Sequence, residues 1–237
     1  HERLRATLKC GLTAPDWPAA TPLAFIFPRE NASIIGATQL NDRRWDVTLF
    51  LDSAVAAEAR QAMALGFVGG ITTNPTLMAK VDGKPFDIIA ELADICPGPV
   101  FYQLTSPTVA EREAEARRIL ALRPNIALKI AMTAENLTLG AKFAKEGATV
   151  CMTACYSAAQ AYLSCQANVK YAVAYVNRST RLQGDGLALV SEMRAVVEAC
   201  DTSTEILVAS LKSPAEVVLA VIAGAHAVTV PLALMLE

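Results

Sequence analysis

The sequence predicts an α/β protein built as a (β/α)8 TIM barrel, and three observations carry this prediction. Eight apolar, strand-like runs follow one another between Val47 and Pro231, and helix-period segments of roughly ten or more residues separate most of them. The first seven runs each carry a lone polar side chain near their C-terminal end, and in the fourth it is a lysine. The length of 237 residues is close to the roughly 250 typical of one such barrel. Active sites of these barrels lie where the strands end.

The polar side chains at the strand ends are therefore the candidates for chemistry. In chain order the runs are VTLFLD, FVGGITTN, VFYQL, IALKIAM, ATVCMTAC, YAVAYVNR and EILVAS, and AVTVP closes the series. Their polar residues are Asp52, Asn74, Gln103, Lys129, Thr153, Tyr175 with Arg178, and Ser210.

Seven helices are predicted between the strands, at residues 55–65, 86–95, 108–122, 134–146, 157–166, 185–199 and 214–223. Gly147 is a typical C-terminal stop for the fourth. The sequence ends at Glu237, shortly after the last predicted strand. We therefore expect a barrel without its C-terminal eighth helix.

The first 45 residues differ from the rest, because they contain four prolines and little periodicity. We predict an irregular N-terminal extension at 1–45 and a barrel domain at 46–237. The extension fits an organelle-targeting segment, a non-native addition or an irregular appendage. A cytoplasmic protein is the first expectation, with an organelle stroma as the alternative.

Composition excludes several classes of protein. The net charge is −2, and no basic stretch is dense enough for a nucleic-acid surface. The six cysteines form no C-x-x-C pair and no zinc-type spacing with the two histidines, so we expect free thiols and no metal. The stretch from Val217 to Leu236 has no charged residue, but Gly224 and Pro231 divide it into helix, turn and strand. No membrane span is expected.

Lys129 is the most informative of the candidates. Alternation along its strand places Ala127, Lys129 and Ala131 on one face, and Leu128 and Ile130 on the other. Small neighbours leave space around an amine, and a desolvated amine can attack a carbonyl group. A lysine that extends to solvent or pairs with a carboxylate fits the same pattern.

Each of the other candidates also has a structural interpretation. Asp52 could cap a helix with the help of Ser53, and Asn74 could bond only its own backbone before Pro75. Ser210 could cap the helix that follows it, and Arg178 could be an exposed loop charge. The remaining three, Gln103, Thr153 and Tyr175, could be polar side chains that are buried in the core without a catalytic role. Their shared position at strand ends favours the functional interpretation.

From about Val47 onward the chain resembles the transaldolase family, in its small, fructose-6-phosphate aldolase-like branch. The stretches that carry the resemblance are LFLDSA, GGITTNPTLMAK, ALKIAMTAENL, TACYSAAQA, AYVNR, QGDG, LVASLKSP and VTVPL. They cover about four-fifths of the sequence, whereas residues 1–45 match nothing in the family.

The resemblance implies a role for each candidate. Lys129 matches the Schiff-base lysine, Asp52 the strand-one aspartate, and Asn74 the asparagine that holds substrate hydroxyls. A catalytic water would be held by Gln103, Thr153 and Tyr175. The phosphate would be bound by Arg178 and Ser210. Transaldolases proper tend to have Glu and Phe where Gln103 and Tyr175 stand, so these two positions resemble the aldolase.

The function implied is that of a class I aldolase that needs no cofactor. It would form fructose 6-phosphate from dihydroxyacetone and glyceraldehyde 3-phosphate, or cleave it into these two compounds. Its partner would be a sugar phosphate, and the family implies a homo-oligomer, a pentamer or decamer. One alternative is a transaldolase that passes the three-carbon unit to an acceptor, or a relative that acts on sulfo-sugars. The other is a barrel that binds sugar phosphates without turnover, or an inactive fragment.

Overall fold

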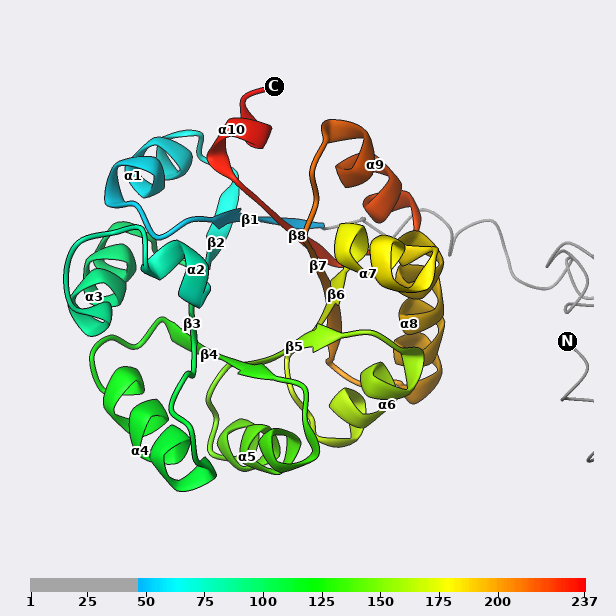
Figure 1. The fold of residues 1–237 in the computed structure, drawn as a ribbon, viewed down its shortest axis with the longest axis horizontal. Coiled ribbons are helices and arrows are strands. Elements are labelled where there is room, and N and C mark those ends of the chain that lie inside the picture. The colour runs from blue at the N-terminus through cyan, green and yellow to red at the C-terminus, as the bar shows by residue number, and fades with distance from the viewer. Residues whose placement is uncertain (1–46) are drawn as a thin grey trace, which may run out of the picture. The chain divides into compact units, whose positions relative to one another are not determined.

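The computed structural model describes residues 47–237, so the predicted extension at 1–45 lies outside the described residues. Eight parallel strands form a closed barrel in which β1 pairs with both β2 and β8 (Figure 1). The strands are β1 (Thr48–Asp52), β2 (Val68–Thr72), β3 (Val100–Gln103), β4 (Ile126–Ala131), β5 (Val150–Cys155), β6 (Tyr171–Tyr175), β7 (Glu205–Ala209) and β8 (Ala227–Val230). The predicted fold class is confirmed.

The seven predicted helices are present and surround the barrel (Figure 1). They are α1 (Ala56–Ala64), α3 (Pro85–Ile95), α4 (Val109–Leu120), α5 (Ala134–Lys145), α6 (Ala158–Gln166), α8 (Gly186–Cys200) and α9 (Pro214–Ile222). Side-chain caps define several of their starts, because a cap satisfies an N–H group without a partner in the helix. Thr108 and Glu111 form a reciprocal capping box before α4.

Three further helices were not predicted: α2 (Pro75–Met78), α7 (Val176–Gln183) and α10 (Leu232–Met235). The run YAVAYVNR was expected to be a strand as far as Arg178, and this was wrong. Strand β6 ends at Tyr175, and Arg178 lies on α7. A short apolar run does not distinguish a strand from a buried helix segment. Val176 is buried as an apolar residue of a strand would be, but it lies at the start of α7.

Two other expectations concern the C-terminal part of the chain. Ser210 does not cap the helix after β7, since Ser213 caps α9 by accepting the Glu216 N–H. The stretch from Val217 to Leu236 is divided among α9, β8 and the four-residue α10. Among the described residues, no helix is long and apolar enough to cross a membrane.

The strands separate two layers of core. Inside the barrel, the rings of Phe50, Phe101 and Tyr171 pack edge to face, with centroids 5.6–6.0 Å apart. We call these three rings the interior aromatic layer. Leu128 and Ile130 belong to the outer core beneath the helices, whereas Ala127 belongs to the interior cluster. The predicted alternation along β4 is therefore confirmed, and Lys129 points inward.

The interior aromatic layer should carry much of the barrel's stability. Replacing the fully buried Phe101 in Phe101→Ala should lower the free energy of unfolding by about 3–5 kcal/mol, because it leaves a cavity in the centre. The matched control is Phe67→Ala, whose ring is 65% exposed. Urea denaturation of both variants measures the difference, and equal losses would contradict this view of the core.

Candidate active site

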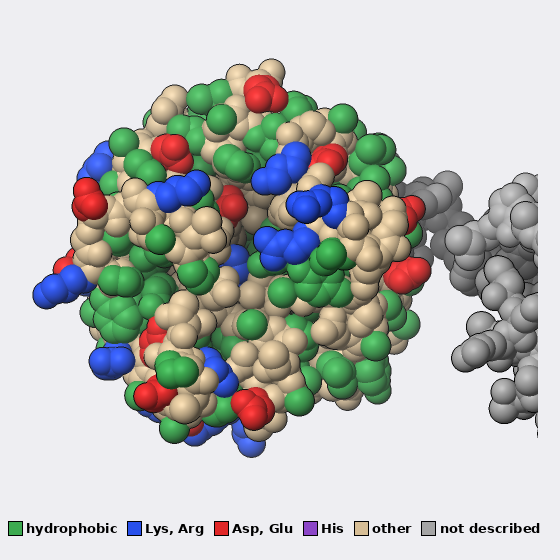
Figure 2. Space-filling view, in the orientation of Figure 1, with side chains coloured by type: hydrophobic (Ala, Val, Ile, Leu, Met, Phe, Trp, Pro, Cys, Tyr) green, Lys and Arg blue, Asp and Glu red, His purple; other side chains and the backbone are tan. Residues whose placement is uncertain are grey.

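A cavity of about 660 Å³ opens at the C-terminal ends of the strands. Figure 2 shows this face hollowed at its centre, with basic side chains gathered along one side of the rim. Seven of the eight candidate residues line the cavity, namely Asp52, Asn74, Gln103, Lys129, Tyr175, Arg178 and Ser210. The eighth, Thr153, is only 1% exposed and forms a hydrogen bond with the Tyr175 hydroxyl. One polar site therefore unites the ends of β1–β7.

Lys129 is the most deeply enclosed charged group of this site. Its side chain is 4% exposed, and its Nζ donates a 3.0 Å hydrogen bond to the backbone carbonyl of Thr73. The neighbour in register on β3 is Gln103, and the one on β5 is Cys151. The interpretation as a solvent-extended lysine is therefore wrong. The amine lies in the cavity, where it can meet a bound carbonyl compound.

Asp52 faces the amine from the end of β1. Burial raises the pKa of Asp52, and attraction to Lys129 and a hydrogen bond from Thr72 oppose only part of this shift. Thr72 Oγ1 donates to Asp52 Oδ1 at 2.9 Å and also contacts Thr229 Oγ1 at 2.6 Å. Asp52 therefore gains and loses a proton closer to neutral pH than an ordinary aspartate does.

Thr153 and Tyr175 form the second polar pair. Thr153 Oγ1 and the Tyr175 hydroxyl are 2.7 Å apart. The two residues lie on β5 and β6, and the register of this strand pair shifts between Met152 and Cys155. Within the shifted segment, Ala154 has a φ of 63°. A left-handed residue inside a strand is a typical β-bulge feature that redirects neighbouring side chains. Of the two residues, only Tyr175 lines the cavity, so Thr153 is connected to the cavity through the Tyr175 hydroxyl.

Asn74 makes a local hydrogen bond and also faces the cavity. Its Oδ1 accepts the Leu77 N–H at 3.0 Å, which caps the short helix α2. The local interpretation is therefore correct, and Asn74 also lines the cavity. Its amide nitrogen has no partner among residues 47–237 and is available to donate to a ligand.

Basic groups gather at the ends of β6 and β7. The Arg178 guanidinium stacks over the Tyr175 ring at 4.7 Å from its centroid. Ser210 has a φ of 62°, and its carbonyl accepts the Asn177 N–H at 3.0 Å. This hydrogen bond ties the start of α7 to the end of β7, so Arg178 and Ser210 line the same cavity. A planar guanidinium in this position suits an anionic group such as a phosphate.

Sequence reasoning missed three charged residues of the cavity wall, Glu58, Lys80 and Lys212. Glu58 accepts a hydrogen bond from Ser53. Lys212 stands two residues after Ser210, and its charge lowers the pKa of Asp52 slightly against the larger effect of burial. All three lie beyond the strands, where the search for polar strand ends did not extend.

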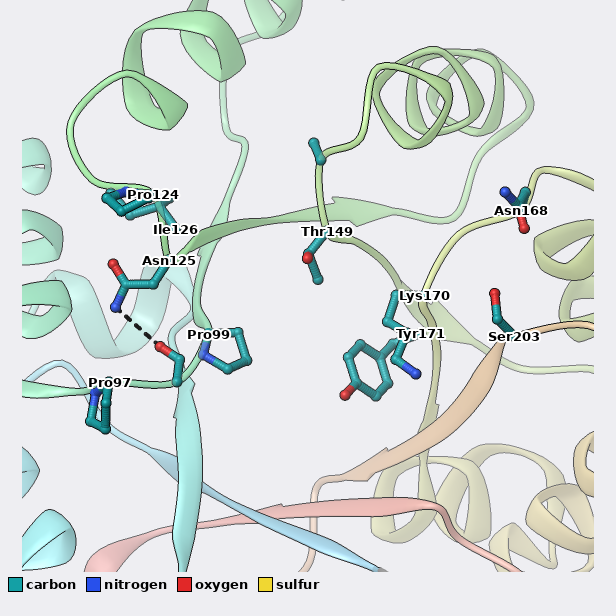
Figure 3. A pocket seen from close by; sticks show the side chains of 12 residues that line it. Pro97, Pro99, Pro124, Asn125, Ile126, Thr149, Asn168, Lys170, Tyr171 and Ser203 are labelled. Carbon is teal, nitrogen blue, oxygen red and sulfur yellow. Dashed lines mark hydrogen bonds between the residues drawn. The ribbon is translucent and has the colours of Figure 1, made fainter.

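A second cavity, of about 490 Å³, lies at the opposite mouth of the barrel and contains none of the candidate residues. Figure 3 shows Asn125 at its edge, with the amide nitrogen directed at the Gly98 carbonyl. The same amide nitrogen also donates to the carbonyls of Ala93 and Cys96. These bonds join two loops, so this mouth has a structural role in the barrel.

The chain is similar to known proteins over the barrel. A family model described as Transaldolase/Fructose-6-phosphate aldolase matches residues 49–237. A "Probable transaldolase" of Phenylobacterium zucineum is 37% identical over 183 residues, which are 77% of this chain and 84% of the relative. Another, of Pelotomaculum thermopropionicum, is 37% identical over 190 residues, with 80% of this chain and 88% of the relative covered.

Asp52→Asn should raise the free energy of unfolding at neutral pH. A carboxyl group whose pKa is raised in the folded state disfavours folding when it is ionised. The wild-type protein should gain stability relative to the variant as the pH falls through the raised pKa towards the unfolded value of 3.8. Urea denaturation between neutral and acidic pH measures both effects.

The matched control is Asp94→Asn, which should have the opposite sign. Hydrogen bonding to Arg123 lowers the pKa of Asp94, so its ionised form favours folding. This variant should be slightly less stable at neutral pH, and the deficit should vanish as the pH falls through the lowered pKa. A loss of stability in Asp52→Asn as well would contradict the electrostatic account of Asp52.

Proposed function

The chain belongs to the transaldolase/fructose-6-phosphate aldolase family of Schiff-base enzymes, and we propose on this basis that it is a class I aldolase. Its reaction would be the cleavage and formation of fructose 6-phosphate, with dihydroxyacetone and glyceraldehyde 3-phosphate as the two halves. The single observation that carries the proposal is the buried amine of Lys129, which shares one cavity with Asp52, Tyr175 and Arg178.

The reaction begins when the deprotonated amine of Lys129 attacks the ketone carbon of the sugar. Loss of water gives an iminium ion, which accepts the electron pair of the breaking C3–C4 bond. The C4 hydroxyl loses its proton as the aldehyde forms, and an enamine remains on Lys129. Protonation of the enamine carbon and hydrolysis of the iminium then release dihydroxyacetone and restore the amine.

The proton transfers are assigned to the polar groups that surround Lys129. Gln103 is its neighbour in register, and Thr153 and Tyr175 lie within hydrogen-bond distance of one another. A water molecule held by these three side chains would carry the protons, as the resemblance implies. Asp52 and the free amide of Asn74 would orient the substrate hydroxyls. Each group acts across a hydrogen bond, which suits general acid–base catalysis.

The phosphate is assigned to the basic side of the cavity. Arg178 and Ser210 are the pair implied by the resemblance, and Lys212 lines the same wall. A phosphate dianion gains two parallel hydrogen bonds from a guanidinium group, and the nearby lysine adds positive charge. The end of β1 and the start of α1 contribute Asp52 and Glu58 to the cavity, and these carboxyl groups would repel the phosphate and favour one orientation of the sugar.

The second candidate function is that of a transaldolase, in which the enamine attacks a sugar-phosphate acceptor and is not protonated. The relatives, which are described as probable transaldolases, favour it. Gln103 and Tyr175 favour the aldolase, because transaldolases proper tend to have Glu and Phe at these positions. Release of free dihydroxyacetone in the absence of an acceptor would distinguish the two.

Lys129→Arg should reduce activity to below about one per cent of wild type, because a guanidinium stays protonated and forms no imine. Borohydride treatment with fructose 6-phosphate should attach the three-carbon unit covalently to Lys129 in the wild type and to nothing in the variant. Peptide mass mapping measures this. The control is Lys145→Arg on the outer helix α5, which should react like wild type. Labelling of a different lysine would refute the proposed function.

Tyr175→Phe should lower the release of free dihydroxyacetone by about 10²- to 10⁴-fold, because the hydroxyl that contacts Thr153 is lost. Transfer to erythrose 4-phosphate needs no proton on the enamine and should fall less. Parallel assays of release and transfer give the ratio for each protein. If the ratio is the same in both, Tyr175 has no part in proton transfer.

Arg178→Ala should raise KM for phosphorylated substrates roughly ten- to hundredfold, since a charge-assisted contact is worth about 1.5–3 kcal/mol. The KM for unphosphorylated dihydroxyacetone should change far less. Arg181→Ala, on the same helix α7, is the matched control and should leave both values near wild type. Equal effects of Arg178→Ala on both kinds of substrate would assign Arg178 a structural role.

A further inference from the structure

Strand β8 contributes a polar side chain that the search for polar strand ends did not include, that of Thr229. The strand lies beside β1, where Thr229 is in register with Phe50 (Figure 1). Phe50 belongs to the interior aromatic layer, so Thr229 also points into the barrel. Its side chain is 3% exposed and does not line the cavity. A hydroxyl group buried in this way needs a hydrogen-bond partner.

That partner is the hydroxyl group of Thr72 on β2. Thr229 Oγ1 and Thr72 Oγ1 are 2.6 Å apart, and Thr72 Oγ1 donates to Asp52 Oδ1 at 2.9 Å. Thr72 is 1% exposed and stands in register with Asp52. Side chains from β8, β2 and β1 therefore form one hydrogen-bonded chain, which leads from the interior of the barrel to the cavity.

The direction of this chain follows from the number of protons available. A threonine hydroxyl group has one proton to donate, whereas an ionised carboxylate can only accept. The Thr72 proton is used in the bond to Asp52, so the proton between the two threonines comes from Thr229. Accepting that proton polarises the Thr72 hydroxyl group, which strengthens its own bond to the carboxylate.

The chain holds one carboxylate oxygen of Asp52 and leaves the other free. Among residues 47–237, only Thr72 donates a hydrogen bond to this carboxylate, and it does so at Oδ1. The second oxygen, Oδ2, is not one of the buried polar atoms without a partner, so it is accessible. Since Asp52 lines the cavity, Oδ2 is available to a hydroxyl group of a bound molecule.

We propose that Thr229 is a positioning residue, which acts through Thr72 to fix the orientation of the Asp52 carboxylate and to favour its ionised form. Its effect on activity rests on the proposed aldolase function, in which Asp52 orients the substrate hydroxyls. Thr229 would act without touching the substrate, because it does not line the cavity. This role accounts for a polar side chain on β8, the strand that has no candidate residue at the cavity.

The charges around Asp52 stay the same when Thr229 is changed. Burial raises the pKa of Asp52, while Lys129, the bond from Thr72 and Lys212 act in the opposite direction. The other titratable groups that line the cavity are Glu58, Lys80, Tyr175 and Arg178. A change in the pKa of Asp52 in a Thr229 variant would therefore report on the hydrogen-bonded chain.

The test compares Thr229→Val, which keeps the volume of the side chain and removes its proton, with Thr229→Ser, which keeps the hydroxyl group. An NMR titration of the carboxyl carbon of Asp52, assigned with Asp52→Asn, measures the pKa without substrate. Thr229→Val should raise this pKa by about half a pH unit, the equivalent of the net contribution of one hydrogen bond. Thr229→Ala should raise it as well, and Thr229→Ser should restore the wild-type value.

Activity is measured on the same proteins with fructose 6-phosphate. In Thr229→Val, kcat/KM should fall about two- to tenfold, and the acidic limb of its pH profile should move to higher pH with the pKa of Asp52. Thr229→Ser should recover both. Because Thr229 acts through Thr72, adding Thr229→Val to Thr72→Val should cause no further loss.

Thr204→Val is the matched control for the loss of a buried hydroxyl group. Thr204 is 2% exposed, and its Oγ1 donates to the Val169 carbonyl at 2.7 Å at the opposite mouth of the barrel. This variant should lower the melting temperature about as much as Thr229→Val does, but it should leave the titration of Asp52 and the pH profile unchanged.

An unchanged pKa of Asp52 in Thr229→Val would overturn the proposal. So would an equal effect in Thr229→Ser or Thr204→Val, or a raised pKa with kcat/KM and its pH profile unaltered. Borohydride trapping on Lys129 of the wild type is measured in parallel. A lack of trapping would count against the aldolase itself, whereas the titration of Asp52 needs no turnover and tests the chain separately.

Discussion

The amine of Lys129 is held inside a closed barrel, above three packed aromatic rings and below the mouth of the cavity, with the Thr73 carbonyl as its hydrogen-bond partner. A charge in that position is costly unless neighbouring groups compensate for it. The barrel supplies compensation by directing the ends of seven strands to one place. Because every strand is parallel, their polar C-terminal residues meet around the amine, while the apolar residues before them close the interior.

Asp52 is a position where the requirements of stability and of function conflict. Burial raises its pKa in spite of the nearby lysine, so the ionised carboxylate lowers the stability of the folded chain. In the proposed aldolase this carboxyl group would orient the substrate hydroxyls, and a neutral amide in its place would relieve the cost. The strained backbone of Ala154 and Ser210, both at positive φ next to polar groups of the site, belongs to the same pattern.

The two mouths of the barrel differ in chemistry. The C-terminal mouth gathers the ionisable side chains of the candidate site, whereas the opposite mouth, which holds the second cavity, is bordered by loops that hydrogen bonds of Asn125 and Thr204 join.

The sequence by itself determined the barrel, its seven long helices, and the inward position of Lys129, because alternation along a strand and the period of a helix are local properties. It also identified strand ends that share one cavity. Only the tertiary structure decided that Arg178 stands on a short helix over Tyr175, and that a bulge accompanies the contact of Thr153 with Tyr175. Helices of one or two turns after a strand depend on contacts with distant segments, such as the bond from Asn177 to Ser210. No local pattern contains such contacts, and for the same reason only the fold showed that Lys80 and Lys212 line the cavity wall.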